Sequence, residues 1–167
     1  MSDSFQDVEQ RIAQTRKRLR GYPHEQVMLA RLIAHVQKRQ TDLCNAALKA
    51  HALNMVTYTA LMMLFGAPNQ TLTPSELSQA TGEKPTNITR VCDELLARDL
   101  IERSAGTEDR RKVVLRLSTA GDALVRQFQP DILQTLEQLY GGFDAEQTET
   151  LTTLLRQVLQ RLDQAES

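Results

Sequence analysis

The chain has 167 residues, of which 41% are hydrophobic and 25% are charged, and its formal net charge is −1. This composition is typical of a soluble globular protein with a core of its own, and no apolar run is long enough to cross a bilayer. The polar, acidic N-terminus has no apolar secretory segment, so we expect a cytoplasmic protein that makes no contact with membranes.

Two helices are expected before residue 53. Residues 1–20 have an amphipathic pattern, which Gly21–Pro23 ends. The apolar side of this first helix would carry Phe5, Val8, Ile12 and Leu19. Residues 24–52 contain neither glycine nor proline, and their apolar side chains recur at helical spacing. A helix of about 27 residues would be roughly 40 Å long, which is too long to be buried within one small domain, so it must pack elsewhere.

A third helix is expected from Asn54, a good capping residue, to Phe65, before Gly66–Asn69. It is rich in soft and aromatic side chains, namely Met55, Tyr58, Met62 and Met63. One interpretation is core packing. The other is an adaptable wall of a small-molecule cavity, because methionine and aromatic side chains conform to varied apolar ligands.

A short helix followed by a glycine-containing turn is predicted next. It begins after Thr73, a good N-cap whose capping box is completed by Glu76, and it ends at Gly82. Leu77 and Ala80 are expected to point inward. A second amphipathic helix follows at once, so the two make a helix-turn-helix unit.

The second helix of this unit covers residues 84–98. Its apolar side chains recur at i, i+3, i+4 and i+7 and form one stripe: Ile88, Val91, Cys92, Leu95 and Leu96. Its other face begins with hydrogen-bonding side chains of short to medium reach: Thr86, Asn87, Thr89 and Arg90. A helix that reads DNA needs this arrangement, because its first turns enter the major groove while its apolar face docks on the domain. Taken alone, the pattern also fits an ordinary amphipathic surface helix.

A β-hairpin is predicted after the second helix. Its strands would be Leu100–Arg103 and Lys112–Leu117, joined by the polar loop Ser104–Asp109. A helix-turn-helix followed by such a hairpin is a winged helix. Positive charge gathers near the tip at Arg110, Arg111 and Lys112, where a hairpin reaches phosphates or a minor groove.

Two helices are expected after the wing. Ser118 would cap one from Thr119 to about Tyr140, kinked at Pro130, and Asp144 with Gln147 would start the last one. The last helix carries an apolar stripe at helical spacing: Leu151, Leu154, Leu155, Val158, Leu159 and Leu162. Such a stripe needs a partner, and we expect it in the N-terminal helices of the same chain and of a second one.

No phosphate-cradling loop, nucleophile motif or metal-ligand spacing is present in the sequence, so we expect neither an enzyme nor a cofactor or metal site. Two cysteines are too few for a disulfide framework or a zinc cluster. Cys92 lies on the apolar stripe and is expected to pack. Cys44, late in the long helix, leaves a redox-sensing role open.

Four motifs make the chain resemble the MarR family of bacterial transcription regulators. They are Pro-Ser-Glu-Leu at 74–77, Thr86-Asn87-x-Thr89-Arg90, Asp109-x-Arg111, and Leu117-Ser118-x-x-Gly121. The likeness is greatest to the EmrR-type repressors of multidrug-efflux operons. It is carried there by Ser4-Phe5 with Glu9-Gln10, by the long helix from Glu25 to Lys49, and by Thr86-Asn87.

The resemblance implies a mostly α protein of α+β class, with a winged helix between N- and C-terminal dimerisation helices. The expected parts are residues 1–53 for dimerisation, 54–118 for DNA binding and 119–167 for dimerisation. The expected contacts to double-stranded DNA are Ser75, Lys84, Thr86, Asn87, Thr89, Arg90, Asp109, Arg110, Arg111 and Lys112. Among these, Asp109 would orient Arg111 toward the DNA.

The resemblance also implies a homodimeric repressor that binds a pseudo-palindromic operator and is released by a small aromatic or lipophilic effector. The effector cleft would lie where the long helix, the methionine-rich helix and the helix after the wing meet. Its wall would include Arg31, His35, Met55, Tyr58 and Met62. Two rival functions remain open at this point, a cysteine-based redox regulator and a winged helix used only for protein–protein assembly.

Overall fold

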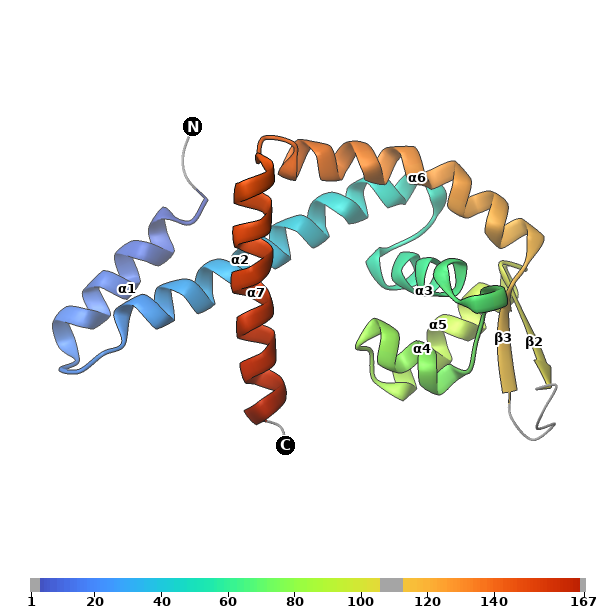
Figure 1. Cartoon of the computed structure of the whole chain (residues 1–167), viewed down its shortest axis with the longest axis horizontal. Helices are drawn as coiled ribbons and strands as arrows, with labels where there is room; N and C mark the ends of the chain where they lie inside the picture. The colour runs from blue at the N-terminus through green and yellow to red at the C-terminus, as the bar shows by residue number, and fades with distance from the viewer. Residues whose placement is uncertain (1–3, 106–112, 166–167) are drawn as a thin grey trace.

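The computed structural model describes residues 4–105 and 113–165, and within them the chain forms seven α-helices and three short strands (Figure 1). The α-helices are α1 (Gln6–Arg18), α2 (His24–Leu48), α3 (Met55–Gly66), α4 (Pro74–Thr81), α5 (Pro85–Ala97), α6 (Thr119–Tyr140) and α7 (Ala145–Ala165). The strands are β1 (Thr71–Leu72), β2 (Ile101–Ala105) and β3 (Val113–Leu117). Two short 3₁₀ turns, η1 (Lys49–His51) and η2 (Pro68–Gln70), follow α2 and α3. The predicted mostly helical winged-helix fold is confirmed.

Helices α1 and α2 form a hairpin at the end of the molecule opposite the wing (Figure 1). Phe5 and Ile12 are buried in this hairpin, as the amphipathic pattern predicts. Leu19 was expected on the same side, but it follows the end of α1 and its side chain is 56% exposed. Among the described residues, no helix is both long and apolar enough to span a membrane.

Helix α2 carries an apolar stripe that the rest of the chain leaves largely uncovered. Its buried residues, Cys44 and Leu48, both lie in the last two turns, next to the winged helix. Five apolar side chains farther back remain exposed: Leu29, Leu32, Ile33, Val36 and Leu43. The long helix therefore extends well beyond the core that it joins.

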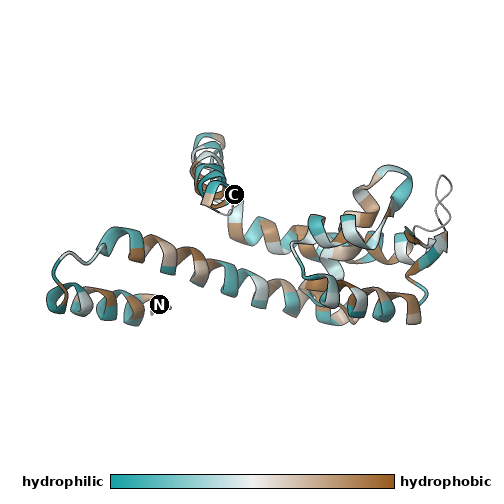
Figure 2. Cartoon of the chain, turned by 90° about the horizontal axis from the view of Figure 1, so that it is seen from below, coloured by the Kyte–Doolittle hydropathy of each residue, from teal (hydrophilic) through white to brown (hydrophobic). Residues whose placement is uncertain are grey.

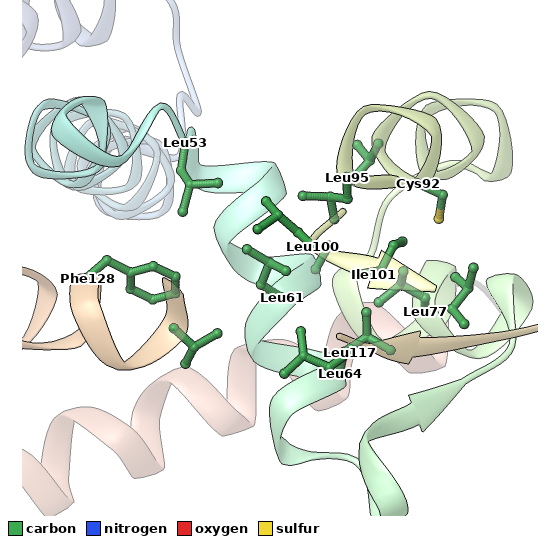
Figure 3. Packing of buried hydrophobic residues seen from close by; sticks show 14 of the residues in the cluster. Leu53, Leu61, Leu64, Leu77, Cys92, Leu95, Leu100, Ile101, Leu117 and Phe128 are labelled. Atoms are coloured by element: carbon green, nitrogen blue, oxygen red, sulfur yellow. The ribbon is translucent and has the colours of Figure 1, made fainter. Parts of the chain in front are cut away.

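Helix α3 lies at the centre of the core (Figure 3). Asn54 caps it: its side-chain oxygen accepts from the N–H groups of Val56 and Thr57, and Thr57 Oγ1 accepts from the Asn54 N–H. Leu61 and Leu64 are fully buried and pack with side chains from α5, β2 and β3. The first of the two interpretations of the methionine-rich helix, core packing, thus applies to its inner face.

The three strands form an antiparallel sheet in the order β1-β3-β2. The wing pairing runs from Ile101 opposite Leu117 to Ala105 opposite Val113. Strand β1 was not predicted, and it places Thr71 opposite Arg116.

Just before β1, Gln70 Nε2 donates to the carboxylate of Asp122 on α6 at 3.1 Å. Arg126 Nε donates to the same carboxylate at 2.7 Å. These two hydrogen bonds, that from Arg126 first, hold the pKa of Asp122 below its usual value. The contacts join the segment before β1 to the first two turns of α6.

The motif Leu117-Ser118-x-x-Gly121 is where the wing joins α6. Ser118 Oγ accepts from the Gly121 N–H at 2.9 Å and donates to the Asp99 carbonyl at 2.6 Å. The Ser118 N–H donates to the Leu100 carbonyl at 3.1 Å. Helix α6 then continues through Pro130 to Tyr140, so the proline does not divide it.

Helix α7 stands apart from the rest of the chain. Asp144 and Gln147 start it with the predicted capping box, in which each backbone N–H donates to the other side chain. It crosses α2 in Figure 1, but Figure 2 shows the two helices well separated. None of its described residues is buried, and Leu154, Leu159 and Leu162 are each more than half exposed.

Gly121 should tolerate no side chain. A Cβ there would lie 2.1 Å from the Leu100 carbonyl oxygen and 2.8 Å from Leu117, so the backbone would have to move. We expect Gly121→Ala to lower the free energy of unfolding by at least about 2 kcal/mol. The matched control is Gly66→Ala at the end of α3, where nothing lies within 4 Å of the added Cβ.

The control variant should be as stable as the parent protein or slightly more stable, because alanine favours a helix over glycine. Denaturant unfolding at one protomer concentration compares the two variants with the parent. Equal midpoints for the two variants would contradict the close packing of α6 on Leu100.

Candidate nucleic-acid interface

The turn between α4 and α5 is held by hydrogen bonds from α4. Helix α4 begins with the predicted capping box of Thr73 and Glu76, and it ends at Gly82, whose φ is 69°. Ser78 Oγ donates to the Glu83 carbonyl at 2.6 Å, and the Glu83 N–H donates to Thr81 Oγ1 at 3.3 Å. Both backbone groups of Glu83 are therefore bonded to α4, and these bonds fix the direction in which α5 begins.

One expectation for α4 was wrong. Leu77 is fully buried, but Ala80 faces solvent. Ser78 and Thr81 are half-buried in its place, because their hydroxyl groups make the contacts of the turn.

Helix α5 docks through the stripe that the sequence predicts. Ile88, Val91, Cys92 and Leu95 are each at most 1% exposed, and Leu96 lies at the edge of the core. Figure 3 shows Cys92 and Leu95 pointing from α5 toward β2 and α3. The opposite face is open to solvent, and it begins at the first turn of the helix.

That open face carries four of the ten predicted DNA contacts. Thr86, Thr89 and Arg90 are exposed, and Asn87 is half-buried. Lys84, the N-cap residue of α5, and Ser75, in the first turn of α4, are exposed as well. Thr89 Oγ1 donates to the Pro85 carbonyl at 3.1 Å, so its hydroxyl offers only acceptor capacity in this state.

A chain of polar contacts runs along the open face of α5. Asn87 Nδ2 donates to the Glu83 carboxylate at 2.6 Å, and Asn87 Oδ1 accepts from Arg90 Nε at 3.3 Å and Nη2 at 3.1 Å. Arg90 Nη1 lies 3.4 Å from the Glu94 carboxylate. Sequence reasoning named Asn87 and Arg90 separately and missed Glu83, although acidic residues favour the start of a helix.

The wing is described only in its strands. Four predicted contacts, Asp109, Arg110, Arg111 and Lys112, lie outside the described residues. Strand β2 is joined to α5 through Arg103, whose Nη2 lies 3.5 Å from Asp93 Oδ1.

The far end of α5 is bonded to the turn between α2 and α3. Arg98 donates from Nη1 to the Ala52 carbonyl at 2.7 Å and from Nη2 to the His51 carbonyl at 3.2 Å. His51 Nε2 lies 2.7 Å from Asp131 Oδ2 on α6, and the His51 side chain is only 8% exposed. Arg98 therefore joins the end of α5 to the turn that connects α2 and α3. Its acceptors are 46 and 47 residues away, and no local pattern signals them.

The five predicted ligand residues do not line one cleft within a single chain. Met55, Tyr58 and Met62 pack at the edge of the core, and the Tyr58 ring lies 5.4 Å from that of Phe128 on α6. Arg31 lines a groove between α1 and α2, together with Asp7, Arg11 and Tyr22.

His35 also belongs to the α1 end of the molecule. Its ring lies 3.1 Å from Ser4 Oγ and 5.3 Å from the Phe5 ring. Cys44, near the end of α2, is buried in the core against which Tyr58 of α3 packs, and Arg31 is roughly 20 Å from it along the helix axis. The i, i+4 spacing of Arg31 and His35 predicts their shared side of α2 but not what faces it.

Both cysteines are free and buried. Burial raises the pKa of the Cys44 thiol. The pKa of the Cys92 thiol is raised as well, and burial has a larger effect on it than the nearby charges of Arg103 and Asp93. A raised pKa leaves less thiolate at neutral pH, and the thiolate is the form that reacts with oxidants. The structure therefore gives no support to the redox-sensing alternative.

Comparison with known proteins covers both the winged helix and the flanking helices. The model of the MarR family matches residues 53–113. The transcriptional repressor MprA of Escherichia coli strain K12 is 35% identical over 166 residues, which are 99% of this chain and 94% of MprA. Among curated relatives, the multiple antibiotic resistance protein MarR of the same strain is 29% identical over 81% of this chain and 94% of its own.

Among solved structures, a cysteine-to-serine mutant of MarR from Escherichia coli, in complex with operator DNA, superposes with a TM-score of 0.73. The superposition covers 95% of this chain and 99% of the MarR chain, at 24% sequence identity. The two proteins therefore share a fold.

Proposed function

Because this chain belongs to the MarR family of DNA-binding transcription regulators, we propose that it is a homodimeric repressor of a multidrug-efflux operon and of its own gene. It binds a pseudo-palindromic operator in duplex DNA and is released by small aromatic or lipophilic compounds. The observation that carries the proposal is the docking of α5, which buries its apolar stripe and leaves Thr86, Thr89 and Arg90 open to solvent. We propose an efflux operon as the target because the chain resembles EmrR-type repressors.

In the proposed complex, the first turns of α5 enter the major groove. Thr86, Thr89 and Arg90 supply acceptors and donors for base edges, which carry a distinct pattern for each base pair there. Lys84 is the N-cap residue of α5 and Ser75 lies in the first turn of α4, and at helix N-termini side chains and backbone N–H groups meet phosphates. The wing, with Asp109–Lys112, reaches the backbone or the adjacent minor groove.

The dimer is proposed from two apolar surfaces that have no cover within the described chain. One is the stripe on α7, and the other is the exposed stripe on α2 that includes Leu32 and Val36. Exposed apolar surface of this extent is characteristic of an interface. A two-fold dimer buries the same patch on both chains and matches a two-fold symmetric operator.

The effector is proposed to bind where α3 meets α2 and α6, beside Met55, Tyr58 and Met62. A planar, weakly acidic aromatic molecule suits soft and aromatic side chains with a cation nearby. Within one chain, Arg31 and His35 lie at the other end of α2, so the site includes them only if the second chain supplies them. The turn bonded to Arg98 lies beside this region and offers a short path from the effector to α5.

The rival reading as a protein–protein module makes a different prediction about salt. Binding of DNA through phosphates weakens steeply as salt rises, because condensed counterions are released. Absence of salt-dependent binding to any duplex would favour the rival and would refute the proposed function.

The α7 stripe should hold the dimer. Leu154→Asp places a charge in an apolar seam, which costs several kcal/mol, so we expect a monomer or an unfolded chain in sedimentation. Thr153→Asp is the matched control, because it adds the same charge on the opposite face of α7. A folded dimer of unchanged affinity in Leu154→Asp would refute this interface.

The wing should contribute to affinity more than to sequence choice. If Arg111 meets a phosphate, Arg111→Ala weakens binding to all duplexes and flattens the slope of log K against log salt by about one unit. If it enters the minor groove, preference for A·T flanks falls as well. Lys17→Ala on the exposed side of α1 removes the same charge far from the winged helix and serves as the control.

Thr86→Ala should act in the opposite way to Arg111→Ala. It should relax sequence choice by about 1–3 kcal/mol at one base pair and leave the salt slope unchanged. Anisotropy titrations over a salt series measure both variants. A silent Arg111 together with a uniform loss in Thr86→Ala would show that the docking is wrong.

Effector and operator should weaken each other's binding. A coupling of about 1–3 kcal/mol corresponds to a change of roughly 5- to 150-fold in either affinity, and the two changes must be equal. Titration calorimetry with salicylate-like and uncoupler-like compounds, on the free protein and on the operator complex, measures this coupling. Equal affinity in both states would show that a compound is no inducer, however tightly it binds.

A further inference from the structure

Glu83 is a residue to which neither the family motifs nor the sequence pattern gives a role. It lies in the turn before α5, one position ahead of the N-cap residue Lys84. Its backbone is bonded on both sides, to Ser78 through its carbonyl and to Thr81 through its N–H. The carboxylate is therefore anchored at the positive end of the α5 dipole, where negative charge is stabilised.

The carboxylate of Glu83 determines which way the Asn87 amide faces. An ionised carboxylate only accepts hydrogen bonds, so the amide nitrogen of Asn87 must point toward it, as the 2.6 Å contact has it. The amide oxygen then points toward Arg90 and accepts from both Nε and Nη2. Reversing the amide would break all three contacts at once.

The same contacts determine how Arg90 is presented. A guanidinium carries five N–H donors, of which Asn87 takes two and Glu94 one. Two donors remain, which suits the bidentate contact of arginine with O6 and N7 of guanine. Asn87 itself has both amide atoms engaged, so in this state it cannot make the paired contact with adenine for which asparagine is known.

We propose that Glu83 and Asn87 are positioning residues that fix Arg90 for reading one guanine in each half-site. The proposal rests on the proposed function and adds to it which side chain reads a base and which ones only hold it. Glu83 acts through Asn87 and needs no contact with the DNA. Its own negative charge repels phosphates, so it contributes to selectivity and not to affinity.

Two variants of Glu83 separate the acceptor from the charge. Glu83→Gln and Glu83→Ala remove the same negative charge, but glutamine keeps an oxygen that can accept from Asn87. The probe is the operator that the wild-type protein selects from a random duplex pool, together with its single-base variants. Competition binding measures the preference at each base pair, and Arg90→Ala identifies the pair that Arg90 reads.

Glu83→Gln should bind every duplex somewhat more tightly than the wild type does, because it lacks the negative charge that repels phosphates. Glu83→Ala should do so only on duplexes without guanine at the Arg90 pair, because it also loses the positioned contact. The wild type and Glu83→Gln should prefer guanine at the Arg90 pair by about 10- to 100-fold. In Glu83→Ala and Asn87→Ala this preference should fall to within about threefold, with other pairs little changed. Circular dichroism checks that the variants are folded.

Three results would overturn the proposal. They are full discrimination in Glu83→Ala, an equal loss of discrimination in Glu83→Gln and Glu83→Ala, and loss of an adenine preference in Asn87→Ala while the guanine preference remains. In each case the wild type still binds DNA with sequence preference, so the proposed function survives. Failure of the wild-type protein to select any sequence would instead refute the proposed function, and this inference with it.

Discussion

The burial of Ile88, Val91, Cys92 and Leu95 determines which face of α5 meets solvent. The aliphatic ones, Ile88, Val91 and Leu95, each contribute about 1.5–3 kcal/mol when fully buried, whereas exposed polar pairs like those along the open face of α5 contribute less than about 1 kcal/mol each. Rotation of α5 by a single residue would turn the stripe by about 100° and expose much of it. The core therefore sets the orientation of the helix, and the contacts among Glu83, Asn87 and Arg90 only adjust the side chains that the core has already placed.

Both ends of α5 are bonded to other parts of the chain. At the start, α4 fixes the turn through Ser78 and Thr81. At the end, Arg98 bonds the turn after α2, and His51 in that turn lies 2.7 Å from Asp131 of α6. Helix α2 carries one of the uncovered apolar stripes, so a rearrangement of the proposed dimer would move α2. That movement would be transmitted to α5 through the contacts of Arg98 and His51. These contacts are suited to moving the two copies of α5 relative to each other without unfolding either winged helix.

The elements that sequence reasoning predicted well are those whose physics is local. The capping boxes at Thr73 and Asp144 and the stripe of α5 each lie within about two helical turns, where spacing alone determines which side chains meet. The prediction of which α4 side chains face the core was only partly right. Ser78 and Thr81 point inward because they form hydrogen bonds in the turn after α4, while the apolar Ala80 is exposed.

What the sequence could not reveal depends on distant segments. Strand β1 is a two-residue pairing with β3, too short for any periodicity. The contacts of Arg98 and His51 join residues 46 to 80 positions apart. Within one chain the predicted ligand residues do not meet for the same reason, since helical spacing gives the side of α2 on which Arg31 and His35 lie but not the element that covers it.

We propose that two copies of α5, held by the terminal helices, read two half-sites about one turn of DNA apart. Selection of sequences from a random duplex pool by the full-length protein tests this claim most directly. We expect the selected sequences to contain an inverted repeat with half-sites centred about 10 base pairs apart. Enrichment of a single unrepeated element, or of no sequence at all, would contradict it.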